Sequence, residues 1–349
     1  MCEYSCDDDG LPTDWHMVHL GSKAVGGTGL VMAEATAVTP AGRLTPSCSG
    51  IWSDAHVDAW RPITKFIAEQ GSVSGIQIAH GGRKASHTEP WNTPTRHLGS
   101  DEKGWQIVGP SAIEFDGSFG TPQELTNQEI AEITQQFVDG ALYSLEAGFK
   151  VVELHFAHGY LASSFMSPLS NHREDEYGGS LENRCRFALE TITEIRKAIP
   201  ESAPLFVRIS SSEFVEGGWD IEDSVQIAKW MKDAGVDLVD ASAGGNSADQ
   251  VLKLSPGYQV PFADAIRNQA GIMTAAVGLI TEAKQAEEIL QAGQADAVFI
   301  GRELMRNPYW SLYAQAQLDG ESDRWAKQYK PSSFDFKYTG PSEVISTSS

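Results

Sequence analysis

Short apolar runs alternate with longer amphipathic stretches along most of this 349-residue chain. Seven of the runs predict β-strands, at residues 30–38, 72–80, 149–157, 204–210, 236–242, 272–278 and 297–302. The longer stretches predict helices, at residues 15–25, 54–70, 126–148, 181–199, 221–234, 259–268, 281–292 and 303–318. Strands that alternate with helices form parallel sheets through right-handed crossovers, so this pattern predicts an α/β fold.

A (β/α)8 TIM barrel is the α/β architecture that we expect. Such a barrel typically takes about 250 residues, and near-continuous apolar runs suit parallel strands that are buried on both faces. An eighth strand would have to precede the helix at 15–25, where no apolar run stands. We therefore predict a barrel that lacks its first strand. An open doubly wound sheet is the alternative, which is less favoured because no GxGxxG motif follows an early strand.

Two stretches interrupt the alternation and divide the chain. Residues 81–125 form a long polar segment with several prolines, and loops of this length usually serve function or are disordered. A Ser-rich end closes the sequence. We expect a barrel over residues 1–320, with a loop insertion at 81–125, and a C-terminal tail over 321–349.

Charge and cysteine content exclude several classes of function. The chain has 26 basic and 47 acidic residues and a net charge of −21, which repels nucleic acid and anionic membranes. No apolar run approaches the length of a membrane span, and the first residues lack the pattern of a signal peptide. Four cysteines in a chain this long make neither a disulfide framework nor a zinc motif. We expect a cytoplasmic protein without a metal, whose partner is a small-molecule substrate.

The segment ELHFAHGY at 153–160 carries the strongest chemical signal. His155 and His158 follow a predicted strand, and active sites of such barrels lie at the C-terminal ends of the strands. Two imidazoles there can donate hydrogen bonds to a carbonyl or phenolate oxygen that gains negative charge during reaction. Tyr160 can supply a proton. The alternatives are a metal site, which would need a third ligand, and a purely structural role for these side chains.

Other strand ends carry groups that suit a flavin. Arg208 is a lone cation on an apolar strand, and it could contact the electron-rich edge of a flavin from across the barrel opposite Gln77 or form a structural salt bridge instead. Gly278, Gly301 and Arg302 follow the last two predicted strands. Barrels often bind phosphate at these loops.

Several long motifs resemble the Old Yellow Enzyme family of FMN-dependent ene-reductases. They are MCEYS with DWH, EATAV, IQIAHGGRKAS, HFAHGYL…FMSPLSNHREDEYGGSLENRCRF, LFVRIS and VFIGRELMRNP, in the order of the family. The resemblance spans residues 1 to about 318. Cys2 and Tyr4 are similar to the xenobiotic-reductase-like branch, which places a cysteine beside the flavin.

The resemblance implies a role for each matching residue. His155 and His158 would bind the substrate's carbonyl oxygen, and Tyr160 would help to supply the proton. Cys2 would modulate the flavin, and Tyr4 would line the substrate pocket. The remaining matches would hold FMN: Ala35, Gln77 and Arg208 its ring, and Gly278, Gly301 and Arg302 its phosphate. NADPH or NADH would be the reductant, the substrates would be activated alkenes, and a homo-oligomer is compatible with the family.

Two other functions remain open from the sequence. The same pocket could serve a non-reducing FMN-dependent isomerase or cyclase in a biosynthetic pathway. Family members usually carry a short lid hairpin and the first barrel strand before the MC motif, and this sequence starts at that motif. A shortened barrel that binds flavin poorly is therefore the third interpretation.

Overall fold

Seven parallel strands form one sheet whose spatial order follows the order of the chain. The computed structural model describes residues 1–320 and 322–333. Its main sheet has the order β1 (Leu30–Ala37), β2 (Val73–Ala79), β5 (Val151–Phe156), β6 (Leu205–Ser210), β7 (Leu238–Ser242), β8 (Met273–Ala276) and β9 (Ala297–Val298). A doubly wound sheet would reverse its strand order at a switch point. The sequential order excludes that alternative and confirms the predicted α/β fold with a parallel sheet.

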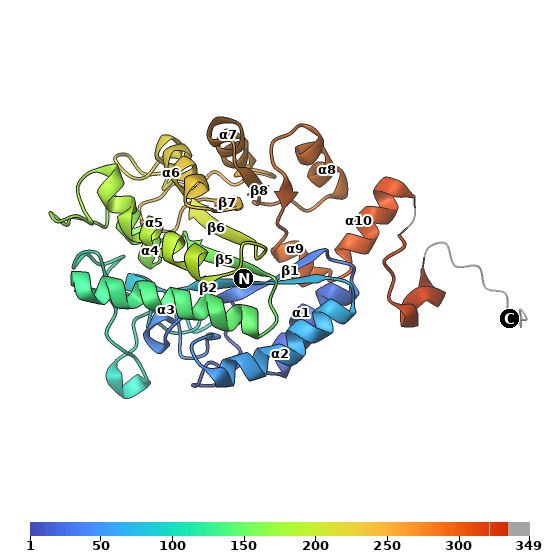
Figure 1. Cartoon of the computed structure of the whole chain (residues 1–349), viewed down its shortest axis with the longest axis horizontal. Helices are drawn as coiled ribbons and strands as arrows, with labels where there is room; N and C mark the ends of the chain where they lie inside the picture. Colours follow the sequence, from blue (N-terminus) through green and yellow to red (C-terminus); the bar gives the residue numbers. More distant parts are fainter. Residues whose placement is uncertain (321, 334–349) are drawn as a thin grey trace, which may run out of the picture.

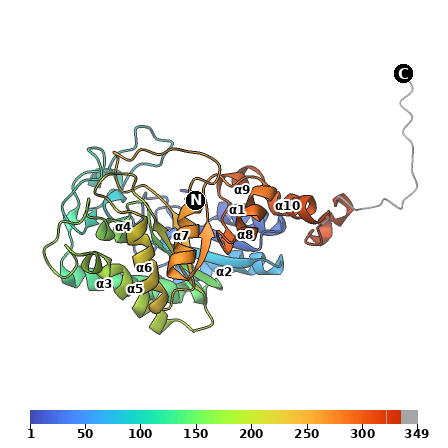
Figure 2. The same ribbon diagram turned by 90° about the horizontal axis from the view of Figure 1, so that it is seen from above.

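Helices cover the outer face of this sheet (Figure 1). They are α1 (Asp14–Val25), α2 (Asp54–Glu69), α3 (Asn127–Glu146), α4 (Leu161–Met166), α5 (Leu181–Ala198), α6 (Ile221–Asp233), α7 (Val260–Ala270), α8 (Ala283–Gln291), α9 (Arg302–Arg306) and α10 (Trp310–Asp319). Neighbouring helices contact one another in succession from α1 to α3 and from α5 to α7, and Figure 2 shows α3, α5 and α6 side by side. No helix in residues 1–320 or 322–333 is both long and apolar enough to cross a membrane.

Strand β5 shows how the sequence separates the core from the site. Val152, Leu154 and Phe156 belong to the hydrophobic core under the helices. Glu153 and His155 point the other way, because successive side chains of a strand face opposite sides, and both line a cavity inside the sheet. The strand is buried on both faces. One face carries its apolar residues, and the other face carries Glu153 and His155, which supply polar groups to the cavity.

One helix prediction was wrong, and one short helix was not predicted. A single helix was expected at 303–318, but the structure has α9 and α10 with a break between them. Pro308 lies in the break, where it has no N–H to donate, and Asn307 before it is extended with φ −131°. The short helix α4 was not predicted, and it lies within the segment that follows the two histidines.

The insertion at 81–125 is folded over part of its length. It contains 3-10 turns at Gly82–Lys84 and Ser100–Glu102, and short strand β3 (Val108–Gly109) pairs with β4 (Gln123–Glu124). At the other end of the chain, a 3-10 helix at Lys327–Ser332 follows α10. The rest of the tail predicted at 321–349, namely residues 321 and 334–349, lies outside the described residues.

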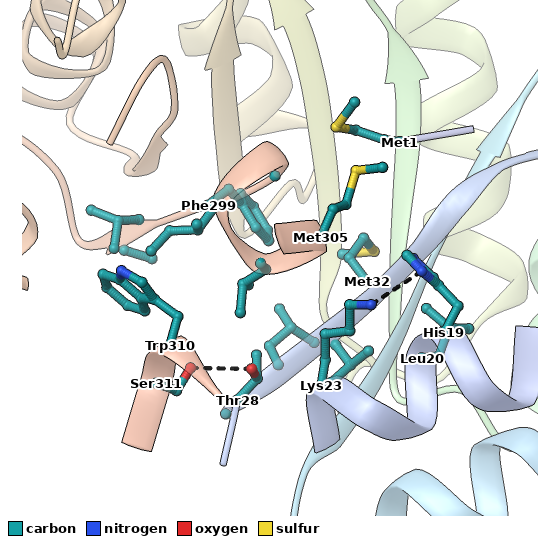
Figure 3. Close-up of a pocket in the computed structure, with 18 of the residues that line it drawn as sticks. Met1, His19, Leu20, Lys23, Thr28, Met32, Phe299, Met305, Trp310 and Ser311 are labelled. Atoms are coloured by element: carbon teal, nitrogen blue, oxygen red, sulfur yellow. Dashed lines mark hydrogen bonds between the residues drawn. The ribbon is translucent and has the colours of Figure 1, made fainter. Parts of the chain in front are cut away.

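The two end strands, β1 and β9, lie on either side of a second cavity of about 410 Å³. Met32 of β1 and Phe299 after β9 both line it (Figure 3), and so do Phe206 and Leu238 of the middle strands. Side chains from both ends and from the middle of the sheet can meet in this way only if the sheet curls. Residues 1–13, before α1, carry no strand, and whether an eighth strand belongs at the edge between β1 and β9 stays a prediction.

Candidate active site

All of the predicted site residues line one cavity of about 630 Å³ inside the curled sheet. They come from the N-terminal segment, from β1, β2, β5 and β6, and from the segments that follow β5, β8 and β9: Cys2, Tyr4, Ala35, Gln77, His155, His158, Tyr160, Arg208, Gly278, Gly301 and Arg302. The curl of the sheet thus brings together residues that lie up to 300 positions apart in the sequence. Whether each one has its predicted role is a separate question.

The turn after β5 holds the two histidines close together. His158 has a φ of +61° and Gly159 a φ of +73°, so the backbone turns back on itself directly after the strand. A Cβ on Gly159 would lie 2.4 Å from the carbonyl oxygen of Gly245, which only glycine avoids. The amide of His158 donates to Ser210 Oγ at 2.8 Å. As a result, the ring centroids of His155 and His158 are 5.0 Å apart.

Hydrogen bonds define which imidazole nitrogens carry protons. The Ala157 amide donates to His155 Nδ1 at 3.3 Å, so the His155 proton is on Nε2. This Nε2 lies 3.3 Å from His158 Nδ1, and His158 Nε2 lies 2.7 Å from Ser242 Oγ. His155 Nε2 therefore donates to His158 Nδ1, so His158 carries its proton on Nε2 and donates to Ser242 Oγ. An oxygen placed between the two rings would accept from His155 Nε2, and it would also accept from His158 Nδ1 once Ser242 donates to His158 Nε2.

Both imidazoles are neutral near pH 7. Burial, followed by the neighbouring His158 and Arg208, lowers the pKa of His155 well below its usual value. Burial, followed by Arg208 and Lys84, does the same to the pKa of His158. Neutral donors of fixed direction suit an oxygen that becomes negatively charged during a reaction.

Tyr160 completes a cluster of three rings. Its ring centroid lies 4.8 Å from that of His155 and 6.4 Å from that of His158. Burial, above all, raises the pKa of Tyr160 above its usual value, so the phenol stays protonated and is a donor. Lys84 supports the cluster from the insertion, since its Nζ donates to the carbonyl oxygens of His158 at 2.9 Å and Gly245 at 2.7 Å.

Arg208 lies on the sheet beside two carboxyl groups. Its Nε is 3.1 Å from Asp240 Oδ2, so the salt bridge that the sequence left as an alternative is present. The Arg208 side chain is nevertheless 21% exposed and lines the cavity. Gln77 Nε2 donates to Glu153 Oε1 at 2.6 Å. The structural role of Arg208 therefore leaves part of its charge available to a ligand.

The N-terminal segment forms another wall of the cavity. Cys2 and Tyr4 both line it, and the Tyr4 ring packs edge-on against Trp91 of the insertion with centroids 5.7 Å apart. Burial, above all, raises the pKa of the Cys2 thiol, which therefore stays protonated. Trp91 is 63% exposed, so this aromatic pair lies at the mouth of the cavity.

The chemistry of the cavity walls fits FMN. A cation and an amide, Arg208 and Gln77, line one part, and Gly278, Gly301 and Arg302 line another, after the last two strands. Several buried polar atoms at the Arg208 end have no hydrogen-bond partner within residues 1–320 and 322–333, including Arg208 Nε. The polar groups at the Arg208 end match the ring of a flavin. The small residues with a cation match its phosphate, and the aromatic rings at the mouth match a substrate.

Sequence reasoning placed Ser242 at a strand end without a role, and it missed Ser210, Lys84 and Asp240, which also act on this site. Ser210 and Ser242 fix the position of His158, and Lys84 binds its carbonyl oxygen. The two serines lie at the ends of predicted strands, but their contacts depend on the strand register. Asp240 had a clearer signal, because a carboxyl in an apolar strand requires a partner and the neighbouring strand carries a lone arginine.

Comparisons with known proteins agree with this geometry. Residues 1–321 match the model of the NADH:flavin oxidoreductase / NADH oxidase family. An NADPH dehydrogenase of Bacillus subtilis (strain 168) is 48% identical over 323 residues, which cover 92% of this chain and 90% of that protein. An NADPH dehydrogenase of Bacillus licheniformis is 50% identical over 321 residues, which cover 91% and 89% respectively.

Solved structures with this fold include two reductases. A 2-naphthoyl-CoA reductase in complex with 2-naphthoyl-CoA superposes with a TM-score of 0.80 at 26% identity, and 92% of this chain spans about half (49%) of that longer one. A morphinone reductase variant in complex with tetrahydroNAD gives a TM-score of 0.73 at 25% identity, over 90% of this chain and 84% of that one. The chain belongs to the NADH:flavin oxidoreductase / NADH oxidase family, that of Old Yellow Enzyme, and is an oxidoreductase.

Proposed function

We propose that this protein is an FMN-dependent ene-reductase that uses NAD(P)H to reduce activated C=C bonds of α,β-unsaturated carbonyl or related compounds. The observation that carries the proposal is the cluster of His155, His158 and Tyr160 in the same cavity as Arg208 and Gln77. FMN, when bound, would accept a hydride from NAD(P)H and deliver it to the β-carbon of the alkene. Several curated relatives that the chain matches are named NADPH dehydrogenases, which favours NADPH as the donor.

The histidines would bind the substrate through its oxygen. A carbonyl oxygen that accepts from His155 Nε2 and from His158 would gain negative charge as the alkene receives the hydride. Donors that are already neutral and oriented stabilise this charge more strongly than they stabilise the substrate, and this difference accelerates the reaction.

Tyr160 would hold the proton that completes the reduction. Its phenol stays protonated because burial raises its pKa, and it lies beside His155, with ring centroids 4.8 Å apart. The α-carbon of a substrate held by the histidines would then be within reach of the phenol. Beside this cluster, where Arg208 pairs with His155 in the sheet register, Arg208 and Gln77 would hold the flavin ring, Ala35 would lie against it, and Cys2 would modulate its potential.

Gly278, Gly301 and Arg302 would hold the phosphate. These residues follow β8 and β9, and phosphate sites of barrels commonly lie in the corresponding loops. Glycine allows the backbone to approach the phosphate closely, and Arg302 supplies the positive charge.

Anaerobic spectroscopy of the purified protein tests the proposal. We expect the protein to bind FMN, NADPH to bleach the flavin absorbance, and cyclohexenone to restore it with formation of cyclohexanone. Restoration of the absorbance only by oxygen would contradict the ene-reductase assignment. Turnover of a substrate without any consumption of NADPH would favour the isomerase or cyclase, and a failure to bind added FMN would overturn the whole proposal.

A further inference from the structure

Three neighbouring strands bring two buried carboxyl groups to one arginine. Glu153 is on β5, Arg208 on β6 and Asp240 on β7, and Arg208 pairs directly with Asp240 in the sheet register. Glu153 and Asp240 are each 1% exposed, and both line the large cavity. The reaction described above uses neither carboxyl group.

The hydrogen bonds of this cluster are incomplete. Glu153 Oε1 accepts from Gln77 Nε2 at 2.6 Å, and Asp240 Oδ2 lies 3.1 Å from Arg208 Nε. Within the described residues, Glu153 Oε2 and Asp240 Oδ1 have no hydrogen-bond partner, and Arg208 Nε makes an ion pair without hydrogen-bond geometry. A buried polar atom without a partner costs about 1–3 kcal/mol, so this arrangement requires an explanation.

The charges of the cluster do not balance if both carboxyl groups are ionised. Arg208, Asp240 and the amino group of Met1 are the charged groups that act on Glu153, while Gln77 and the imidazole of His155 beside it are neutral. The Met1 amino group is the weakest of these influences and forms no ion pair with either carboxyl group within the described residues. One guanidinium therefore faces two buried carboxylates, which would leave an excess negative charge inside the sheet, and burial makes such a charge costly.

We propose that Glu153 and Asp240 are positioning residues that act on the flavin through Gln77 and Arg208, and that one proton is retained between the two carboxyl groups. This inference rests on the proposed function, because it assumes that FMN lies against Gln77 and Arg208. With Glu153 protonated, Arg208 and Asp240 form a neutral pair, and the free face of the guanidinium is available to the flavin. Glu153 also accepts a hydrogen bond from the side-chain NH2 group of Gln77, so the amide oxygen of Gln77 is directed away from Glu153.

The direction of the pH effect follows from this arrangement. Burial, followed by the charge of Asp240, raises the pKa of Glu153 from 4.5 to about 8. Burial also raises the pKa of Asp240, against the effect of Arg208. Below about pH 8 Glu153 keeps its proton, and above this pH the cluster gains a negative charge. That charge opposes the addition of electrons to a neighbouring ring, so reduction of the flavin should become harder as the pH rises.

The midpoint potential of the bound flavin, measured against pH, tests the inference. In the wild-type holoenzyme, we expect an additional fall of the potential above about pH 8. A lower potential means that the protein binds reduced FMN less tightly relative to oxidised FMN. This ratio of affinities should fall by at most about tenfold per pH unit, the limit for one linked proton. Glu153→Gln, which keeps the shape and cannot ionise, should lack the additional fall. Asp240→Asn should raise the potential at neutral pH, because Arg208 loses its counter-charge.

The control is Glu194→Gln, which removes an exposed carboxyl on α5 that pairs with Lys197. It should follow the wild-type profile. Equal profiles for wild type and Glu153→Gln would overturn the inference while leaving the ene-reductase proposal intact. A wild-type profile without any change of slope near pH 8 would do the same, even if the variant did not fold. A wild-type protein that binds no FMN would overturn both.

Discussion

The middle strands of the sheet, called the paired side below, and its two end strands, called the open edge, differ in how many neighbouring strands hold their residues. On the paired side, strands β2, β5, β6 and β7 have a neighbour on each edge, and they carry Gln77, Glu153, His155, Arg208 and Asp240. At the open edge, β1 and β9 have one paired neighbour each and the smaller cavity lies between them.

The residues proposed for substrate chemistry and those proposed for binding the cofactor phosphate lie in different regions of the sheet. Residues proposed for substrate chemistry belong to the paired side, where Ser210 of β6 and Ser242 of β7 hold His158 and His158 in turn contacts His155. Gly301 and Met1, by contrast, line both cavities and lie at the open edge. The chemistry should therefore be robust, whereas retention of the cofactor should be sensitive to changes at the open edge.

The largest effect that we expect comes from the paired side. His155→Ala removes one of two donors to the substrate oxygen, so the rate of enone reduction should fall by roughly 10²–10³-fold. The affinity for a para-substituted phenol, which mimics the enolate, should fall as well. Stopped-flow reoxidation and titration of the charge-transfer band with the phenol measure the two effects. The exposed His172→Ala is the control, and an unchanged phenol affinity in His155→Ala would contradict the assignment.

The pH dependence of folding gives the next largest effect. Burial lowers the pKa of His80, after β2, from 6.5 to about 4. Between about pH 4 and pH 6.5, His80 therefore binds a proton in the unfolded chain but stays neutral in the folded protein. The stability associated with this neutral imidazole is complete above pH 6.5 and is lost as the pH falls to about 4. At 1.36 kcal/mol per unit, the loss is roughly 3 kcal/mol.

Urea unfolding of wild type and His80→Gln, at neutral and at acid pH, measures this loss. The variant cannot take up the proton, so its free energy of unfolding should decrease less on acidification than that of the wild type. His172→Gln changes an exposed histidine and should behave as the wild type does. An identical acid sensitivity of all three proteins would show that His80 is not buried as a neutral ring.

At the open edge, the expected effect falls on the cofactor. Arg302→Ala removes the proposed phosphate cation, and hydrogen bonds to charged groups contribute about 1.5–3 kcal/mol. FMN affinity should therefore fall by about 10- to 100-fold. The rate at saturating FMN should fall less than the affinity does. Fluorescence titration of the apoprotein with FMN measures this, with Arg267→Ala, whose side chain pairs with Asp296, as the control. A larger loss of rate than of affinity would place Arg302 at the substrate instead.

The same two sides differ in what the sequence could predict. The paired strands were predicted to within about two residues, because their apolar runs are long and bounded by helix caps. Strand β9 was expected at 297–302 but ends at Val298, and the helix after it was wrong because Pro308 interrupts it. The other end strand, β1, was expected at 30–38 and spans Leu30–Ala37, so the local pattern was weak only at the β9 end of the open edge.

The site was predictable as a set of residues and not as a set of contacts. Motifs and strand ends identified the side chains that line the cavity. They could not show that Ser242 contacts His158 or that Lys84 reaches its carbonyl oxygen, because both contacts join segments more than 70 residues apart. The pairing of Arg208 with Asp240 depends on the register of β6 against β7, which an apolar run of this kind does not specify.

The smallest expected effect is on stability, and it comes from adding one methyl group, by a glycine-to-alanine substitution, at the open edge or on the paired side. Gly29 precedes β1 at the open edge, and a Cβ on it would meet nothing within 4 Å. Gly29→Ala should raise the free energy of unfolding by about 0.4–1 kcal/mol, because alanine reduces the entropy of the unfolded chain. Gly159→Ala on the paired side should lower it, since its φ of +73° and the Gly245 carbonyl oxygen leave no room. Chemical denaturation of both variants measures the difference, and equal destabilisation would mean that the open edge is as closely packed as the paired side.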